Sequence, residues 1–240
     1  MNNLEFSNQF DTLVSSYRRF RDFDKQEPLD TIEFDEYEKS LYLTKAQEEL
    51  VLALYTGKNS YGESFEQTEE MRRHLASLVR EVKLSPIQTS NGNPLGMESI
   101  SKFFTLPENL WFITYESVQV TDAKCDAMST LDVYPVTQDE YHKIKRNPFR
   151  GANDRRALRL DLDEDVIEIV CKHTVSSYYV RYLKKLRPIV LEDMPSGVSV
   201  NGRNTESACE LHEALHQRIL ELAVQMALQS KGYNIKNENK

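Results

Sequence analysis

The sequence predicts an α+β protein in which a helical bundle carries an inserted, mostly antiparallel β lobe. Apolar residues recur at helical spacing before residue 84 and again after residue 206. Between these parts the period changes to two, and aromatic and β-branched residues become frequent, without a long helix between the short apolar runs. We expect a helical bundle of residues 1–100 and 200–230, a β-rich lobe of residues 101–199, and a polar C-terminal tail of residues 231–240.

Composition restricts the class of protein. The chain has 240 residues, of which 40% are hydrophobic and 28% are charged, so we expect a folded core. It has no apolar run long enough for a membrane span and no signal-peptide pattern at its N-terminus, which predicts a soluble protein. Three widely spaced cysteines favour a reducing compartment. The net charge of -8 disfavours wrapping of nucleic acid, and no glycine-rich phosphate loop occurs, so we expect no cofactor.

Two further N-terminal helices are predicted from apolar spacing. The first spans 3–20, and a charged linker at 21–31 follows it. Another helix spans about 65–83, beyond the turn-forming residues 57–64, and ends before Pro86. Its apolar face consists of Thr68, Met71, Leu75, Leu78, Val79 and Val82.

The segment 34–55 between them predicts a long helix with two apolar flanks. Asp35 and Glu38 form a capping-box pattern at its start. One flank carries Phe34, Tyr37, Leu41, Leu52 and Tyr55, and the opposite flank carries Tyr42, Leu43, Ala46, Leu50 and Ala53. A helix with two apolar flanks needs a second cover, which we take to be a neighbouring copy or a partner. A second capping-box pattern at Thr44 and Gln47 leaves open two shorter helices with a bend.

The middle of the chain predicts five or six short strands. An exposed loop or hairpin tip around Asn91-Gly92 occupies 85–100 and precedes them. The predicted strands are 110–120, 131–136, 157–162, 166–171 and 178–186, with a last short strand or edge at 188–191 and a helical turn at 138–145.

A final helix is predicted over 207–229, where Ser207 and Glu210 form a capping-box pattern. Its apolar stripe consists of Ala208, Leu211, Leu215, Ile219, Leu222 and Met226. We expect this helix to close the N-terminal bundle.

The final helix also contains a His-Glu-x-x-His pattern, formed by His212, Glu213 and His216. On a helix this spacing places two imidazoles on one face and serves zinc peptidases. Ile219 and Leu222 stand where the longer metal-binding form needs Gly and His, and the alternative is that both histidines flank the apolar stripe. A zinc-dependent hydrolase is therefore the disfavoured alternative, and we expect neither a metal site nor a catalytic set.

A basic cluster surrounds the sequence Asn-Pro-Phe-Arg-Gly at 147–151. It consists of Lys143, Lys145, Arg146, Arg150, Arg155, Arg156 and Arg159. Pro148 and Gly151 shape a loop, and a basic loop on an acidic protein grips either an acidic partner surface or DNA phosphates. The third interpretation is a solvated strand entry with paired arginines.

Taken in order, four motifs resemble a virion structural protein of crAss-like tailed bacteriophages. They are the run 35–40 leading into 43–49, the run 147–151 followed by 155–161, the run 179–184 with 188–191, and the residues 209–211, 215–216, 219–220 and 223–224. The resemblance covers roughly 35–228. It implies a neck component, a ring or head-to-tail adaptor docked between the portal and the tail, with a dodecameric ring around the DNA channel.

The resemblance also implies where the protein acts and what it contacts. The expected partners are other copies of itself, the portal protein and other neck or tail proteins, while genomic DNA passes through the channel without specific binding. The protein is expected in the virion neck after synthesis in the host cytoplasm, with no membrane contact. A ring needs two different contact surfaces on each subunit. The candidate interface residues are Tyr37, Leu41, Leu52 and Tyr55 on the long helix, and Phe149, Arg150, Arg155 and Arg156 on the basic loop. A DNA-binding accessory protein that uses this loop is the other alternative.

Overall fold

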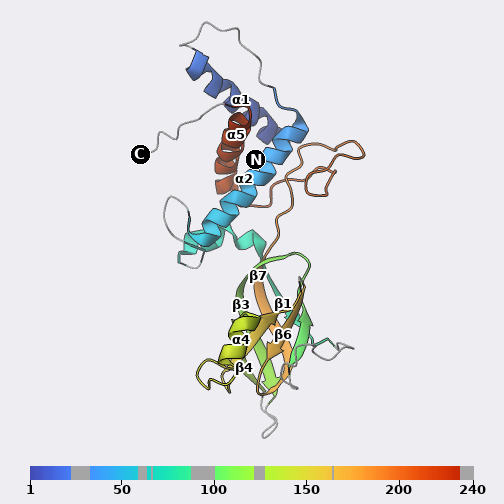
Figure 1. The fold of residues 1–240 in the computed structure, drawn as a ribbon. Coiled ribbons are helices and arrows are strands. Elements are labelled where there is room, and N and C mark those ends of the chain that lie inside the picture. The colour runs from blue at the N-terminus through green and yellow to red at the C-terminus, as the bar shows by residue number, and fades with distance from the viewer. Residues whose placement is uncertain are drawn as a thin grey trace. The chain divides into compact units, whose positions relative to one another are not determined.

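The computed structural model describes residues 1–22, 33–58, 64–65, 67–87, 101–121, 128–163 and 165–232. The chain forms two compact units, which Figure 1 shows. We call Met1–Leu78 with Leu186–Lys240 the helical unit and Val79–Lys185 the β unit. The α+β class with a β lobe is confirmed. The predicted hairpin tip at Asn91-Gly92, the linker from residue 23 on and the tail from residue 233 on lie outside the described residues.

The first two helices form where their sequences predict them. Helix α1 spans Asn3–Asp22 and α2 spans Glu36–Thr56. At the start of α2, Glu38 N donates to Asp35 Oδ1 at 2.6 Å and Asp35 N donates to Glu38 Oε2 at 3.4 Å, so the predicted capping box is confirmed. Gly57 ends α2 with a φ of 76°, the left-handed conformation that glycine adopts without strain. The alternative of two helices with a bend at Thr44 is wrong, because α2 is continuous.

The core of the helical unit lies among α1, α2 and α5, which spans His216–Ser230. Figure 1 shows α5 packed between the other two helices. Phe6 and Phe10 of α1 are fully buried, as are Leu43 of α2 and Ile219 of α5. Each such side chain stabilises the fold by about 1.5–3 kcal/mol relative to an exposed one. In the described residues, no helix is both long and apolar enough to span a bilayer.

The predicted helix at 65–83 is wrong in its second half. Helix α3 covers only Glu69–His74, followed by a 3-10 turn at Ala76–Leu78 and by strand β1 at Val79–Leu84. Met71, Leu75 and Leu78 are buried in the helical unit as predicted. From Val79 on, the backbone pairs with β7, Thr174–Lys184, so tertiary pairing overrides the local helical spacing of Val79 and Val82.

The described residues of the β unit form a seven-stranded sheet in the order β1-β7-β3-β4-β5-β6-β2. Its other strands are β2 at Lys102–Thr105, β3 at Leu110–Thr121, β4 at Met128–Pro135, β5 at Arg156–Asp161 and β6 at Val166–Val170. The strands predicted at 110–120, 131–136, 157–162, 166–171 and 178–186 are confirmed, whereas β1 and β2 were not predicted. All neighbouring strands are antiparallel except β4 and β5. That parallel pair requires a crossover, which contains helix α4 at Gln138–Ile144.

The two faces of the sheet have different covers. Helix α4 covers one face, where Tyr141 and Ile144 pack on Leu158, Leu160 and Val170. The other face forms the larger cluster, which includes Phe104, Val118, Val120, Ile167, Ile169, Tyr178 and Val180. Side chains along β5 and β6 point alternately to the two faces of the sheet, so both strands contribute residues to both cores, as the period of two predicts.

The C-terminal helix begins later than predicted. Ser207 N donates to Val190 O at 2.9 Å and Val190 N donates to Ser207 O at 3.0 Å, an isolated antiparallel bridge. The predicted role of Ser207 as a helix cap is wrong, because the first helical turn after it begins only at Glu213. The predicted strand at 188–191 contributes only this bridge, in the helical unit. The predicted domains, a bundle of 1–100 with 200–230 and a lobe of 101–199, remain a proposal. The two compact units of the structure have other boundaries, at residues 78/79 and 185/186.

Candidate interaction surfaces

Helix α2 buries one arc and leaves the other partly open. Its buried residues run from Lys39 to Leu54 on a single broad side. On the other side Tyr37 is 39% exposed and Leu52 is 40% exposed, while Leu41 and Tyr55 are half-buried. All four predicted interface residues of this helix therefore share one flank. It is a candidate contact surface, because apolar side chains here still lose water-exposed area when a partner covers them.

A polar row on the buried side of α2 holds an extended segment at 187–191. Gln47 Nε2 donates to Arg187 O at 2.7 Å, and Leu191 N donates to Ser40 Oγ at 3.0 Å. Between them, Thr44 Oγ1 accepts from Ile189 N at 3.0 Å and donates to Ile189 O at 3.2 Å. The backbone groups of this buried, extended segment therefore bond to the side chains of Ser40, Thr44 and Gln47, where a strand in a sheet would bond to its neighbour.

The His-Glu-x-x-His residues do not form the predicted arrangement. His212 precedes the helix as the cap of the turn Glu213–Leu215, with extended φ and ψ, so the two imidazoles are not one turn apart on a helix. His216 is buried, and Met1 N lies 2.8 Å from its Nδ1 while Leu211 O lies 3.0 Å from its Nε2. Both ring nitrogens therefore have protein partners. Burial lowers the pKa of His216, and the described residues hold no cluster of three or more metal-binding side chains.

A buried lysine joins α1 to α2. Lys39 Nζ contacts Asp11 Oδ2 and Glu36 Oε1, both at 2.8 Å, and Ser7 Oγ at 3.1 Å. Burial opposes the charged form, but the two carboxylates outweigh it and raise the pKa of Lys39. Lys39 therefore stays charged and fixes the first turn of α2 against α1.

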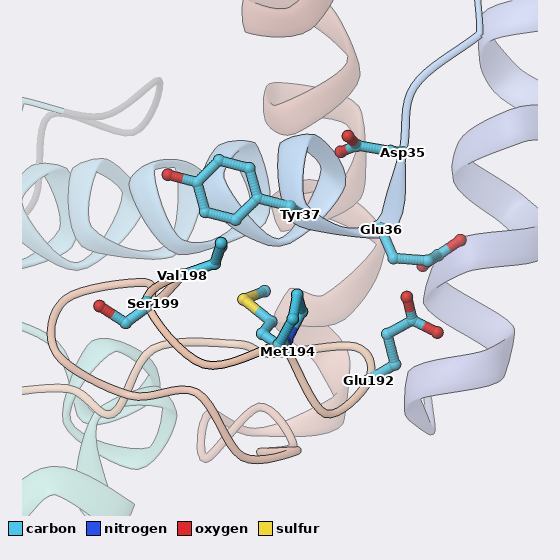
Figure 2. Close-up of a pocket in the computed structure, with 9 residues that line it drawn as sticks. Asp35, Glu36, Tyr37, Glu192, Met194, Val198 and Ser199 are labelled. Carbon is cyan, nitrogen blue, oxygen red and sulfur yellow. The ribbon is translucent and has the colours of Figure 1, made fainter.

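A pocket opens beside this first turn (Figure 2). Its volume is about 520 Å³, and its lining consists of Asp35, Glu36, Tyr37, Glu192, Met194, Pro195, Gly197, Val198 and Ser199. Figure 2 shows Tyr37, Met194 and Val198 along one part of it and the carboxylates of Glu36 and Glu192 at another. An apolar part beside carboxylates suits a ligand that joins an apolar group to a positive charge.

The basic loop of the β unit displays one large apolar side chain. Phe149 is 85% exposed. Asn147 orders the loop, since its Oδ1 accepts from Phe149 N at 2.9 Å and its carbonyl accepts from Gly151 N at 2.7 Å. Gly151 is required there, because a Cβ would lie 2.8 Å from Asn147 O. The loop thus has a fixed shape that presents Phe149 to solvent.

The basic residues around Phe149 divide into two groups. Arg156 Nη1 donates to Phe149 O at 3.1 Å, and its guanidinium lies 4.2 Å from the centre of the Tyr134 ring, so it helps to hold the loop. Arg159 pairs with carboxylates in the sheet. The remaining members are exposed at the surface: Lys143, Lys145, Arg146, Arg150 and Arg155. The interpretation of paired arginines therefore holds for Arg156 and Arg159 only.

A buried polar trio crosses the sheet, and no sequence pattern indicated it. Arg159 Nη1 lies 3.0 Å from both carboxylate oxygens of Glu116, and Tyr178 OH donates to Glu116 Oε2 at 2.7 Å. Burial raises the pKa of Glu116 and, together with the adjacent carboxylate, that of Tyr178. The trio joins β3, β5 and β7, and its side chains are buried partners of one another, which indicates a structural role.

Comparison with known proteins identifies the family. Residues 1–239 match the sequence model of the phage tail ring protein 3/4 family. Ring protein 3 of Bacteroides phage crAss001 is 43% identical over 234 residues, which cover 96% of each chain. Ring protein 4/5 of the same phage is 28% identical over 236 residues, which cover 95% of this chain and 92% of that protein. The resemblance to a crAss-like phage structural protein is thereby confirmed, and the chain belongs to the phage tail ring protein 3/4 family, a family of structural virion proteins.

Proposed function

We propose that this protein forms a homo-oligomeric ring in the phage neck, between the portal and the tail, as a head-to-tail adaptor that lines the DNA channel. The observation that carries the proposal is the match of residues 1–239 to a ring protein family, with a relative named Ring protein 3 at 43% identity. A dodecamer is the copy number that we expect, in contact with the portal and with other neck or tail proteins. The protein would be made in the host cytoplasm and function in the virion.

Two separate apolar surfaces support ring assembly. A closed ring uses two different surfaces of each subunit, since the contact is head to tail. The helical unit offers the partly exposed flank of α2 with Tyr37 and Leu52, and the β unit offers the loop with Phe149. Both carry large apolar side chains that a monomer leaves in water, and burial of such side chains drives association.

Electrostatics support a channel through which DNA slides. The net charge of -8 gives the subunit a repulsive average field toward a polyanion. An adaptor that bound the genome tightly would oppose its passage. We infer that the exposed basic side chains of the Phe149 loop contact protein and not DNA, which separates this proposal from the DNA-binding alternative.

A non-catalytic role is part of the proposal. The one catalytic pattern in the sequence loses its geometry, because His212 lies outside the helix and both nitrogens of His216 have partners. A zinc hydrolase would bind about one zinc ion per chain and would lose it in His212→Ala. We expect no bound zinc in the purified protein.

Negative-stain imaging of the purified protein, alone and mixed with its portal, tests the proposed function. We expect closed rings in at least one of the two samples, and a mass that corresponds to a dodecamer. Monomers in both samples would contradict the ring. A shift of duplex DNA at moderate salt that is lost in Arg150→Ala/Arg155→Ala would instead favour the DNA-binding alternative.

A further inference from the structure

We propose that Phe149 of one copy inserts into the pocket beside Tyr37 of the next copy, and that this contact joins neighbouring subunits. The inference rests on the proposed ring, for which it names the head-to-tail contact. The occupant of the pocket is the basic loop of a second copy of this chain. Phe149 would pack against Tyr37, Met194 and Val198, and the arginines beside it would face Glu36 and Glu192.

The loop is shaped in advance for such insertion. Asn147 Oδ1 accepts from both Phe149 N and Arg150 N, at 2.9 and 3.3 Å, and Arg156 holds the carbonyl of Phe149 at 3.1 Å. A loop whose backbone is already ordered loses little conformational entropy on binding. An aromatic ring that is 85% exposed on such a rigid support has the character of an interface anchor.

The pocket has the size and the lining that this side chain needs. A cavity of about 520 Å³ admits a phenyl ring with the stem of an arginine. Tyr37 offers an aromatic face, and Met194 offers a flexible thioether, which packs favourably against rings. Figure 2 shows that these side chains come from two segments, the first turn of α2 and the loop that carries Met194.

Charge selects the loop of this chain as the occupant. The pocket carries the carboxylates of Glu36 and Glu192, and Lys39 offsets part of the charge of Glu36 through its 2.8 Å contact. Asp35 also lines the pocket, but its carboxylate caps α2. The loop carries exposed cations at Lys145, Arg146, Arg150 and Arg155. Opposite potentials on facing patches steer association and fix the register of a contact.

Topology selects a second copy. The loop belongs to the β unit and the pocket to the helical unit, so they are two different surfaces of one chain. A contact between two different surfaces repeats from copy to copy, and it forms a closed ring when the rotation between neighbours closes. Insertion of the loop into the pocket of its own chain is an outcome that the test distinguishes.

Disulfide trapping tests the contact directly. Pro148→Cys and Ser199→Cys, which keep Phe149 and the apolar lining of the pocket, are prepared as separate proteins, mixed and oxidised, with each alone and the wild type as controls for the natural cysteines. We expect a cross-linked dimer in the mixture, well above the level of the controls. Absence of that dimer would overturn the contact. A double variant that cross-links within single chains, and never forms a ladder of oligomers, would overturn the assignment to a second copy.

Substitutions that leave each unit folded provide the second arm. Phe149→Ala should raise the protein concentration needed for half-maximal ring assembly at least tenfold. The matched control Met128→Ala, which removes another exposed side chain of the β unit, should leave that concentration unchanged. Arg150→Glu should weaken assembly, and Glu192→Arg in the same chain should restore it in part. Equal assembly of Phe149→Ala and Met128→Ala would refute the anchor role.

These experiments distinguish failure of the proposed ring from failure of the proposed contact. Wild-type rings without cross-linking in the mixture would leave the proposed function intact and refute this contact. Cross-linking between copies without rings, alone or with portal, would support the contact and refute the ring.

Discussion

Removal of the Thr44 hydroxyl is the sharpest test of the way in which α2 holds the segment 187–191. In Thr44→Val the side chain keeps its shape, but Ile189 N and Ile189 O lose the partners at 3.0 and 3.2 Å. Thr44 is 2% exposed and Ile189 is fully buried, so water does not replace the lost partner. Each buried unsatisfied group costs about 1–3 kcal/mol, so we expect a loss of about 2–6 kcal/mol in the free energy of unfolding for the two groups.

Urea denaturation followed by far-UV circular dichroism measures this loss. Against a typical stability of about 5–15 kcal/mol, such a loss lowers the urea midpoint clearly at an unchanged slope. Thr56→Val is the matched control, because the Thr56 hydroxyl donates to Leu52 O near the exposed end of the same helix. Its change should stay within about 0.5 kcal/mol. If the two variants were equally stable, the Thr44–Ile189 pair would not anchor the segment.

The remaining predictions concern the buried polar groups. Glu116→Gln leaves Arg159 without its buried charge partner and should destabilise the β unit by about 3–5 kcal/mol in denaturation. Tyr178→Phe removes one hydrogen bond and should destabilise it by only about 1 kcal/mol. A larger loss for Tyr178→Phe than for Glu116→Gln would contradict the structural role of the trio. Burial lowers the pKa of His216, so the unfolded chain binds the proton more tightly, and the stability present above about pH 6.5 should fall as the pH drops below it. His216→Phe should flatten that part of the pH profile, and an unchanged slope would contradict the assignment. Burial raises the pKa of Cys209 to about 11, so its alkylation by iodoacetamide near pH 8 should be far slower than that of a free thiol, as mass spectrometry of the labelled peptide would measure; labelling as fast as that of a model thiol would refute this.

The parts of the fold that local sequence determines were predictable. The capping box of Asp35 and Glu38 and the left-handed Gly57 bound α2 from within its own sequence. Alternation in 157–162 and 166–171 likewise located β5 and β6. These elements depend on neighbours in the chain, and their signals survive in a single sequence.

The wrong predictions of secondary structure fall where pairing with residues distant in the chain determines the backbone conformation. Val79 and Val82 continue a helical spacing, yet pairing with β7 makes them part of a strand. Ser207 has the sequence of a helix cap, yet it pairs with Val190 and the first helical turn begins only at Glu213. In both cases the competing partner lies more than ten residues away in the chain, so that local patterns carry no trace of it.

The interaction surfaces were predictable in part. The spacing of Tyr37 and Leu52 indicated a second flank on α2, and the Pro and Gly around Phe149 indicated a shaped loop. The pocket was not predictable, because Met194 and Val198 belong to an irregular loop without period, and only folding brings them to Tyr37. The assignment of these surfaces to subunit contacts remains a prediction.

Native mass spectrometry of the purified chain mixed with its portal measures ring assembly itself. We expect a complex in which many copies of this chain, twelve by resemblance to the family, are bound as one closed ring. Only free single chains beside unaltered portal, at concentrations where the portal itself is assembled, would contradict it.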